Sequence, residues 1–189
     1  MRKVNMDFRF EHGSTHIFSG PSGSGKTQRV AEILKNMGTL IKGGQQIKNV
    51  VFCYNTWQPL YEELRESGAV TKFVQKMPNV EEFIQLMAPY RNDGGSVCVI
   101  DDFMSHIGAE MQEIITVHSR HYNTTTFLLF QSLFPSAKAY RQISLNARYL
   151  HCFRSPRDNY QIEYLLRQIR PKDYKWIVAA YMDCVQDMY

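Results

Sequence analysis

The segment that most constrains this chain is residues 20–27, which read Gly-Pro-Ser-Gly-Ser-Gly-Lys-Thr and match the pattern G-x-x-x-x-G-K-[ST]. Three glycines allow the backbone to wrap a polyphosphate, so that successive N–H groups and the start of the next helix point at anionic oxygens. Lys26 reaches the β and γ phosphates, and Thr27 is a ligand for Mg²⁺. The sequence therefore predicts a nucleoside triphosphate site formed by Gly20, Pro21, Ser22, Gly23, Ser24, Gly25, Lys26, Thr27 and Gln28.

The residues on either side of this loop have the pattern that such a site needs. Residues 15–18 are short and partly β-branched, as in a buried strand. After the loop, apolar residues recur at helical spacing, and Gly38 is expected to stop the helix; the apolar residues are Val30, Ile33, Leu34 and Met37. Strand, loop and helix in this order argue against a chance match.

Length and composition indicate one ordinary globular domain. The chain has 189 residues, of which 44% are hydrophobic and 21% charged, so we expect a single P-loop domain over residues 1–189. No apolar run approaches the length of a membrane span, and the N-terminus lacks the apolar core of a signal peptide. We therefore expect a soluble, intracellular protein with no membrane partner.

Beyond the loop, short apolar runs alternate with helical patterns, which predicts an α/β fold with a mostly parallel central sheet and helices on both faces. The expected strands are 50–54, 71–74, 97–100, 126–130 and 148–153. The expected helices are 60–66, one after Asn79, one around 111–118, and two near the C-terminus separated by Pro171. Asn79 and Glu82 form a predicted capping box. Trp176, Ile177 and Ala180 are expected to form the buried stripe of the last helix, and Ile162, Leu165, Leu166 and Ile169 that of the helix before it.

Two carboxylates follow the most apolar strand. Mg²⁺ between the β and γ phosphates is held from an adjacent strand tip, so Asp101 is the predicted metal ligand beside Thr27. Asp102 is the predicted catalytic base, placed to polarise a water for attack on the γ-phosphate. A helix N-cap or a supporting charge is the alternative role for Asp102. Motors of this class more often carry Glu at this position.

Gln131 follows the strand 126–130 and should lie at the same edge of a parallel sheet as the phosphate loop. Its neutral amide can sense the γ-phosphate, the alternative being a polar residue facing water. Arg120 and Arg141 are candidates for an arginine that a neighbouring subunit inserts to neutralise transition-state charge. Lys26, Asp102, Gln131 and Arg120 are thus the predicted catalytic set.

Several other features allow more than one interpretation. The segment 138–175 holds nine Lys or Arg residues against three acids, and could face nucleic acid, a neighbour's nucleotide or solvent. Tyr54, Trp57 and Tyr61 could stack a base, although a core cluster is commoner. His118 and His121 lack metal-binding partners at a matching spacing. The four cysteines form no C-x-x-C pair, and three of them lie in apolar strand-like runs, so core packing is favoured over a metal site or a disulfide.

In their order along the chain, these motifs resemble the genome-packaging ATPases of Polinton/Maverick elements and adintovirus-like DNA viruses. That family belongs to the FtsK/HerA superfamily, which implies a RecA/ASCE-like P-loop fold. Poxvirus-type packaging ATPases are relatives. The resemblance covers most of the chain, through residues 20–27, 53–61, 100–104, 119–123, 131–135, 143–149, 155–158 and 166–169.

The resemblance implies a ring of identical subunits, a hexamer or pentamer, that hydrolyses ATP with Mg²⁺ to drive double-stranded DNA into a preformed capsid. It implies a capsid or portal-vertex partner, and a location in the host nucleus, at the viral assembly site or in the virion. It also favours Arg120 over Arg141 as the arginine acting in trans. The family continues into a final strand pair, so we expect the C-terminal strands to be truncated here.

Two other functions remain open. The string Gly-Pro-Ser-Gly-Ser-Gly-Lys also looks like the loop of guanylate kinases, although Asp101-Asp102, Gln131 and the lack of an arginine-rich lid favour a hydrolase. The other alternative is a nucleotide-gated assembly protein with little turnover.

Overall fold

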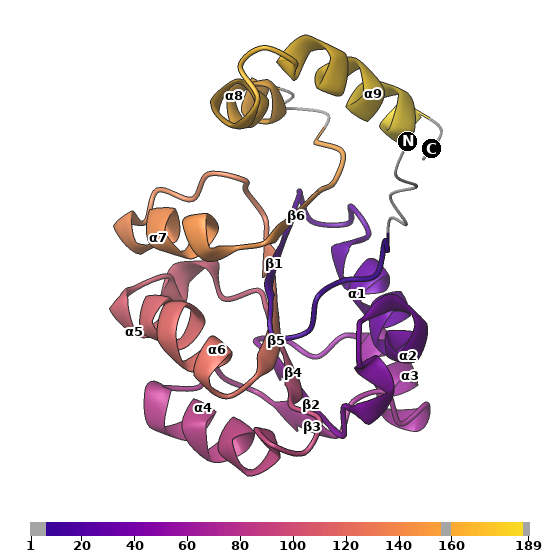
Figure 1. Cartoon of the computed structure of the whole chain (residues 1–189), viewed down its shortest axis with the longest axis vertical. Helices are drawn as coiled ribbons and strands as arrows, with labels where there is room; N and C mark the ends of the chain where they lie inside the picture. Colours follow the sequence, from indigo (N-terminus) through magenta and orange to yellow (C-terminus); the bar gives the residue numbers. More distant parts are fainter. Residues whose placement is uncertain (1–6, 156–159, 187–189) are drawn as a thin grey trace, which may run out of the picture.

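The computed structural model describes residues 7–155 and 160–186, and its centre is a six-stranded parallel sheet in the order β3-β2-β4-β5-β1-β6. The strands are β1 Thr15–Ser19, β2 Asn49–Tyr54, β3 Lys72–Val74, β4 Ser96–Asp101, β5 Thr124–Phe130 and β6 Tyr149–Cys152. Parallel strands need crossover connections, and helices cover both faces of the sheet (Figure 1). The predicted fold class is confirmed.

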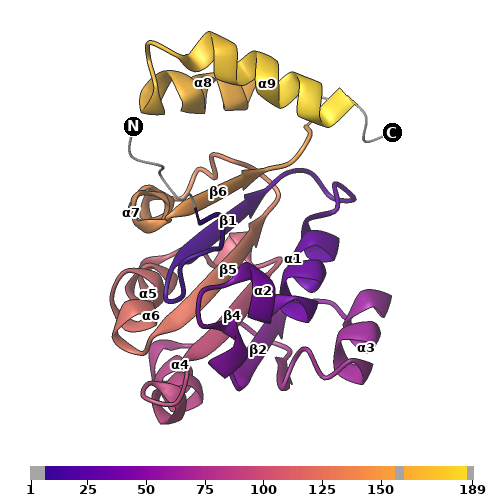
Figure 2. The same ribbon diagram turned by 45° about the vertical axis from the view of Figure 1, so that its right-hand side comes forward.

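The helices divide between the two faces and a separate C-terminal pair (Figures 1 and 2). One face carries α1 Lys26–Lys35, α2 Met37–Leu40 and α3 Pro59–Glu66; the other carries α4 Val80–Met87, α5 Ala109–Glu113, α6 Ser119–His121 and α7 Lys138–Asn146. The pair is α8 Tyr160–Ile169 and α9 Tyr174–Gln186. Short helical turns are η1 Gly44–Gln46, η2 Ala88–Tyr90, η3 Met104–His106 and the π-helical η4 Ile114–His118.

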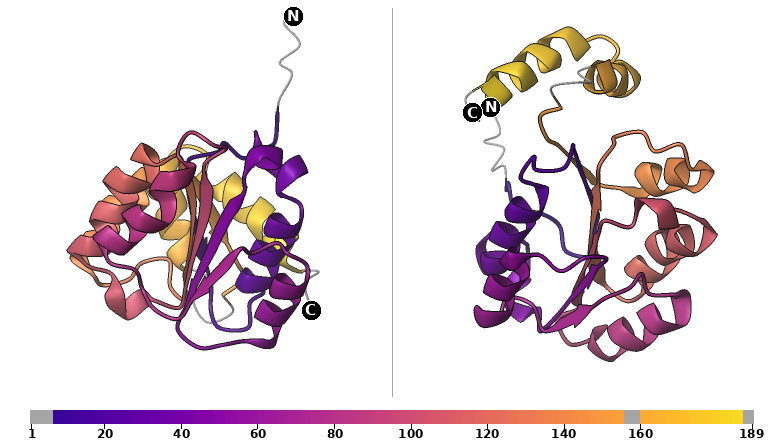
Figure 3. Two further views of the ribbon diagram at one scale, coloured as in Figure 1. Left: turned by 90° about the horizontal axis from the view of Figure 1, so that it is seen from below. Right: turned by 180° about the vertical axis from the view of Figure 1, so that it is seen from behind.

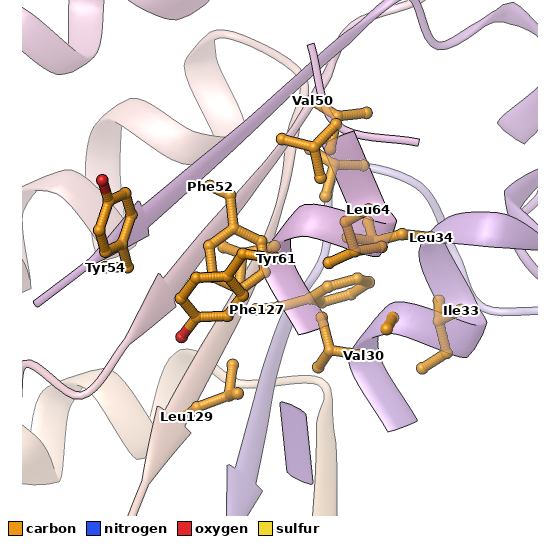
Figure 4. Packing of buried hydrophobic residues seen from close by; sticks show 14 of the residues in the cluster. Val30, Ile33, Leu34, Val50, Phe52, Tyr54, Tyr61, Leu64, Phe127 and Leu129 are labelled. Atoms are coloured by element: carbon orange, nitrogen blue, oxygen red, sulfur yellow. The ribbon is translucent and has the colours of Figure 1, made fainter. Parts of the chain in front are cut away.

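The hydrophobic core between the sheet and helices α1 and α3 fixes the position of α1, the helix that follows the phosphate loop. Val30 and Leu34 of α1 and Leu64 of α3 are buried against strand residues such as Phe52 and Phe127 (Figure 4). Strands β2, β4 and β5 are buried along their whole length, because each is covered on both faces. This burial explains why their sequences read as continuous apolar runs.

The second core lies on the opposite face, where α4, α5 and α7 pack. It includes Phe83, Met111 and Ile143, all fully buried. The predicted capping box starts α4: the Glu82 N–H donates to Asn79 Oδ1 at 2.8 Å, and the Asn79 N–H donates to Glu82 Oε2 at 3.2 Å.

Among the helices that flank the sheet, which together with it form the body of the molecule, one expectation is wrong, one is confirmed with longer bounds, and one helix was not expected. Gly38 does not stop the first helix: α1 ends at Lys35, where the Asn36 side chain donates to Glu32 O at 2.8 Å, and Gly38 lies inside α2. The helix expected around 111–118 runs from Ala109 to His121 through the π-helical turn η4. Helix α7 was not predicted, because its buried face is essentially two residues, Tyr140 and Ile143.

The C-terminal helices are confirmed, but their buried stripes match the expectation only in part: Ile162 of α8 is buried as expected, whereas other members of the two stripes are not. Trp176 is 74% exposed and Ile169 is 53% exposed, whereas Val185 is buried at 9%. The reason is that α8 and α9 pack mainly on each other and lie across the end of the sheet (Figure 3), so each presents little surface to the body. Arg157 and Asp158 of the basic segment, with Pro156, lie outside the described residues.

Candidate nucleotide-binding site

The phosphate loop joins the end of β1 to the start of α1 (Figure 2), and two of its glycines illustrate why it needs this residue. Gly25 has φ of 89°, in the left-handed region, and directly precedes the first residue of α1. At Gly20, a Cβ would lie 2.6 Å from Phe153 Cβ. A side chain at either position would therefore displace the loop.

Lys26 and Ser24 are the buried polar groups of the loop. Lys26 Nζ donates to Gly20 O at 2.7 Å and to Pro21 O at 2.8 Å. Burial lowers the pKa of Lys26, while the nearby charges of Asp101 and Asp102 act in the opposite direction. Ser24 Oγ is buried with no hydrogen-bond partner among the described residues. An unpaired buried hydroxyl and a cation on loop carbonyls both fit an anionic ligand.

Thr27 and Asp101 meet at the base of the site. Thr27 Oγ1 donates to Asp101 Oδ2 at 3.1 Å, and Tyr61 of α3 donates its hydroxyl to the same oxygen at 2.8 Å. Burial raises the pKa of Asp101, and the hydrogen bonds from Tyr61 and Thr27 partly offset this rise. A hydroxyl and a carboxylate in contact are oxygen ligands suited to Mg²⁺.

Asp102 and Gln131 lie beside this pair at the tips of β4 and β5. Gln131 Nε2 donates to Asp102 Oδ1 at 2.9 Å. Asp102 has φ of 65°, a left-handed conformation that costs free energy for a residue with a side chain. It does not cap a helix, since the next turn, η3, has Phe103 as its N-cap. The strained backbone holds the Asp102 carboxylate in reach of Gln131.

One cavity of about 310 Å³ collects these groups, a size within the range of small-molecule sites. Its walls are Ser22, Gly23, Ser24, Gly25, Lys26, Thr27, Gln28, Gln58, Leu60, Asp101, Asp102, Leu129 and Gln131. Gly20 and Pro21 do not line the cavity, but their carbonyl oxygens accept hydrogen bonds from Lys26 Nζ. The sheet order explains the convergence, because β5 lies between β1 and β4 and brings Gln131 between the loop and Asp101.

The two candidate arginines lie elsewhere. Arg120 belongs to α6, which precedes β5, and lines a different cavity together with Arg148 at the amino-terminal edge of the sheet. Strand β5 separates this edge from Gln131 by roughly 20 Å at about 3.3 Å per residue. Arg141 lies on α7, in a groove facing α8. Neither arginine lines the cavity of its own phosphate loop.

Tyr61 is the site residue whose role the sequence did not reveal. The sequence pattern marked it only as part of an aromatic cluster, and its ring does pack with Tyr54 and Trp57, at 5.5 and 5.6 Å between centroids. Its hydroxyl reaches Asp101 because α3 lies against the β2–β4 part of the sheet. No spacing along the chain encodes that tertiary contact.

Comparisons with known proteins give the fold a precedent. No family model matches the chain, and no curated protein sequence matches it. Among solved structures, it is similar to B204, the DNA-packaging ATPase from Sulfolobus Turreted Icosahedral Virus, at 15% identity and a TM-score of 0.56, covering 87% of each chain.

Two structures of the genome packaging NTPase B204 from Sulfolobus turreted icosahedral virus 2 are also similar. The complex with ATP-gammaS gives 15% identity and a TM-score of 0.53, covering 80% of this chain and 81% of that chain. The complex with AMPPCP gives 13% identity and a TM-score of 0.54, covering 90% and 88%. At these identities the likeness establishes the fold, which is that of a P-loop ATPase.

None of the described helices combines the length and apolar character needed to cross a membrane.

Proposed function

We propose that this chain is an ATP-hydrolysing motor that moves viral double-stranded DNA into a preformed capsid. The observation that carries the proposal is the convergence of the phosphate loop, Asp101, Asp102 and Gln131 on one cavity. A phosphate loop alone binds a triphosphate, whereas hydrolysis also needs a base for water and a group that responds to the γ-phosphate.

Each residue of the cavity has a distinct role in this proposal. Lys26 exchanges its two carbonyl acceptors for phosphate oxygens. Thr27 and Asp101 are the side chains that would hold Mg²⁺, which neutralises charge on the β and γ phosphates when bound. Asp102 takes a proton from the attacking water. Gln131, whose amide donates a hydrogen bond to Asp102 in this structure, senses the γ-phosphate. Tyr61 holds the Asp101 carboxylate in place.

Arg120 completes the site from a neighbouring copy. Its position at the far edge of the sheet from its own phosphate loop excludes a role on the nucleotide that the same subunit binds. In a head-to-tail ring, each subunit offers a second surface to its neighbour's nucleotide site; the proposal assigns Arg120 to that surface, where its guanidinium neutralises transition-state charge. The proposal therefore includes a homo-oligomeric ring, with a hexamer or pentamer as the expected size.

The DNA and capsid partners follow from two lines of support. The fold is shared with the DNA-packaging ATPase B204, and the motifs resemble the packaging ATPases of the Polinton/Maverick and adintovirus type. On this basis the chain acts in the host cell at the site of viral assembly, with a capsid or portal vertex as partner. Residues 1–189 then form one ATPase domain.

Phosphate release from ATP, measured with and without duplex DNA and with GMP as an acceptor, tests the function. We expect DNA to stimulate release and GMP to have no effect. Transfer of phosphate to GMP would identify a guanylate-kinase type of enzyme instead. Tight ATP binding with no turnover under any condition would identify a nucleotide-gated assembly protein.

The arginine is tested by mixing subunits. Arg120→Ala and Asp102→Asn subunits are each expected to be inactive alone, and mixed rings should regain activity, because a subunit with intact Asp102 can receive Arg120 from its Asp102→Asn neighbour. Arg141→Ala is the matched control and should remain active. Absence of rescue in mixed rings of confirmed composition would contradict the trans assignment.

A further inference from the structure

A second cavity, of about 550 Å³, adjoins the phosphate site and shares Ser24, Gly25 and Gln28 with it. Its other walls come from the first half of α1, the end of β6 with the residues after it, and the last turns of α9. The residues are Arg29, Glu32, His151, Cys152, Phe153, Arg154, Tyr181, Cys184 and Val185. The two hollows therefore meet along the phosphate loop, where a triphosphate would continue into its sugar and base.

The walls of this second cavity suit a heterocyclic ring. Phe153 flanks the phosphate loop, since its Cε1 lies 4.0 Å from where a Cβ on Gly25 would stand. Tyr181 faces it from α9 and donates its hydroxyl to Phe153 O at 3.0 Å. Val185 adds a buried apolar side chain from the next turn of α9. Aromatic and aliphatic walls with polar groups at the rim are typical of sites that bind a base.

Helix α9, which closes this cavity, belongs to a helix pair that is separated from the rest of the molecule by further cavities. Helix α9 lies over the α1 side of the sheet and α8 over the α7 side (Figures 1 and 3). A cavity of about 190 Å³ separates α8 from the tips of β1 and β6, and a larger groove separates it from α7. Contacts between this helix pair and the rest of the molecule include the Leu133 N–H donating to Gln161 Oε1 at 3.1 Å and the ring contact of Phe134 with Tyr164 at 5.3 Å.

We propose that the base and sugar of the nucleotide occupy the cavity under α9, so that nucleotide binding clamps the α8–α9 pair onto the body. This inference rests on the proposed nucleotide site and adds to it the base-binding walls and the element that responds to occupancy. A ligand that contacts both Phe153 and α9 fills the cavity between the α8–α9 pair and the rest of the molecule, and thereby stabilises the docked position of the pair.

Cys184 offers a direct readout, because it is exposed and lines this cavity. The experiment measures the alkylation rate of Cys184 by N-ethylmaleimide in the full chain, using mass spectrometry of the peptide. We expect saturating ATP-gammaS to slow alkylation at least fivefold and saturating tripolyphosphate to slow it less than twofold. Equal protection by both ligands, or by neither, would overturn the proposal.

A control cysteine distinguishes local cover from a general change in reactivity. Trp176→Cys in a Cys184→Ser background places the thiol on the outer side of α9, where Trp176 is exposed. Its alkylation should be unaffected by ATP-gammaS. Protection of this outer thiol equal to that of Cys184 would mean that the nucleotide does not act through the cavity.

A binding measurement separates this inference from the function on which it rests. Val185→Arg should weaken ATP-gammaS binding at least tenfold and leave tripolyphosphate binding within twofold, whereas Trp176→Arg should change neither. If Val185→Arg binds both ligands as the wild type does, the base site is wrong and the phosphate site stands. If the wild type binds neither ligand, the nucleotide site itself is wrong, and this inference falls with it.

Discussion

Strand β5 and helix α9 are both regular elements, but they are held in different ways. All seven residues of β5 are buried between two layers of helices, with parallel partners β1 and β4 on either side. Of the α9 side chains that the structure describes, only Val185 is buried. The position of β5 is therefore fixed by the core. Helix α9 borders a cavity on its inner side and contacts the body there through residues such as Tyr181. Our proposals place the chemistry on the region fixed by the core, and the response to ligand on the helix with little buried surface.

Hydrogen exchange gives the largest expected difference between the two regions. Amides of β5 should exchange only through global unfolding, which for natural domains costs about 5–15 kcal/mol. Amides of α9 should exchange through local opening, because little buried surface opposes it. Mass spectrometry of the intact chain without nucleotide measures both. Equal protection in β5 and α9 would break the comparison.

Side-chain truncations, one in β5 and one in α9, sharpen the comparison between the two elements further. Phe127→Ala should cost about 3–5 kcal/mol of unfolding free energy, because this fully buried ring packs against His16 and Phe18 and its loss leaves a cavity. Trp176→Ala should cost less than about 0.5 kcal/mol, since the side chain faces solvent. Denaturant titration measures both values, and a cost at Trp176 near that at Phe127 would show that α9 is part of a core.

The sequence predicted the body better than the C-terminal pair for the same physical reason. Covered strands must be apolar throughout, so β2, β4 and β5 could be recognised, and Asp101 and Gln131 could be placed at their tips. Helix α9 has no comparable constraint, and Trp176, expected inside, is exposed. The roles of Tyr61 and Val185 depend on how helices pack against distant strands, which no local spacing records.

The body should also be sensitive to acid through a buried histidine pair. His16 Nδ1 and His151 Nε2 are 3.1 Å apart, and burial lowers the pKa of His16 to about 3 and that of His151 to about 4. Below an unfolded pKa near 6.5, the unfolded chain takes up protons that the folded chain does not, so stability falls as pH drops. Each histidine should cost about 2 kcal/mol between pH 7 and pH 5.

Chemical denaturation at the two pH values measures this loss. The raised pKa of Asp101 acts in the opposite direction, so the histidine contribution is isolated by a His16→Gln, His151→Gln variant. That variant should lose most of the dependence between pH 7 and pH 5. An unchanged slope would mean that the pair is not the source.

Within the site, Tyr61→Phe gives the smallest expected effect. It removes the hydroxyl that donates to Asp101 Oδ2 at 2.8 Å and keeps the ring in its core position. Loss of a group that orients a metal-binding carboxylate typically weakens metal affinity about 10–100-fold, so the Mg²⁺ concentration needed for ATP binding should rise about tenfold or more. Trp57→Phe, in the same aromatic cluster, is the control. Identical Mg²⁺ titrations for the Tyr61→Phe variant and the wild type would remove Tyr61 from the site.

The central claim is that Asp102, held beside the phosphate loop by a left-handed backbone conformation, makes this nucleotide site a hydrolytic one. A single-turnover measurement tests it most directly, comparing ATP binding and phosphate release in the wild type, Lys26→Ala and Asp102→Asn, with Asp93→Asn as a surface control. We predict that Lys26→Ala abolishes binding, that Asp102→Asn binds ATP but loses release by a factor of about 10² or more, and that Asp93→Asn behaves as the wild type. Retained turnover in Asp102→Asn would contradict the account.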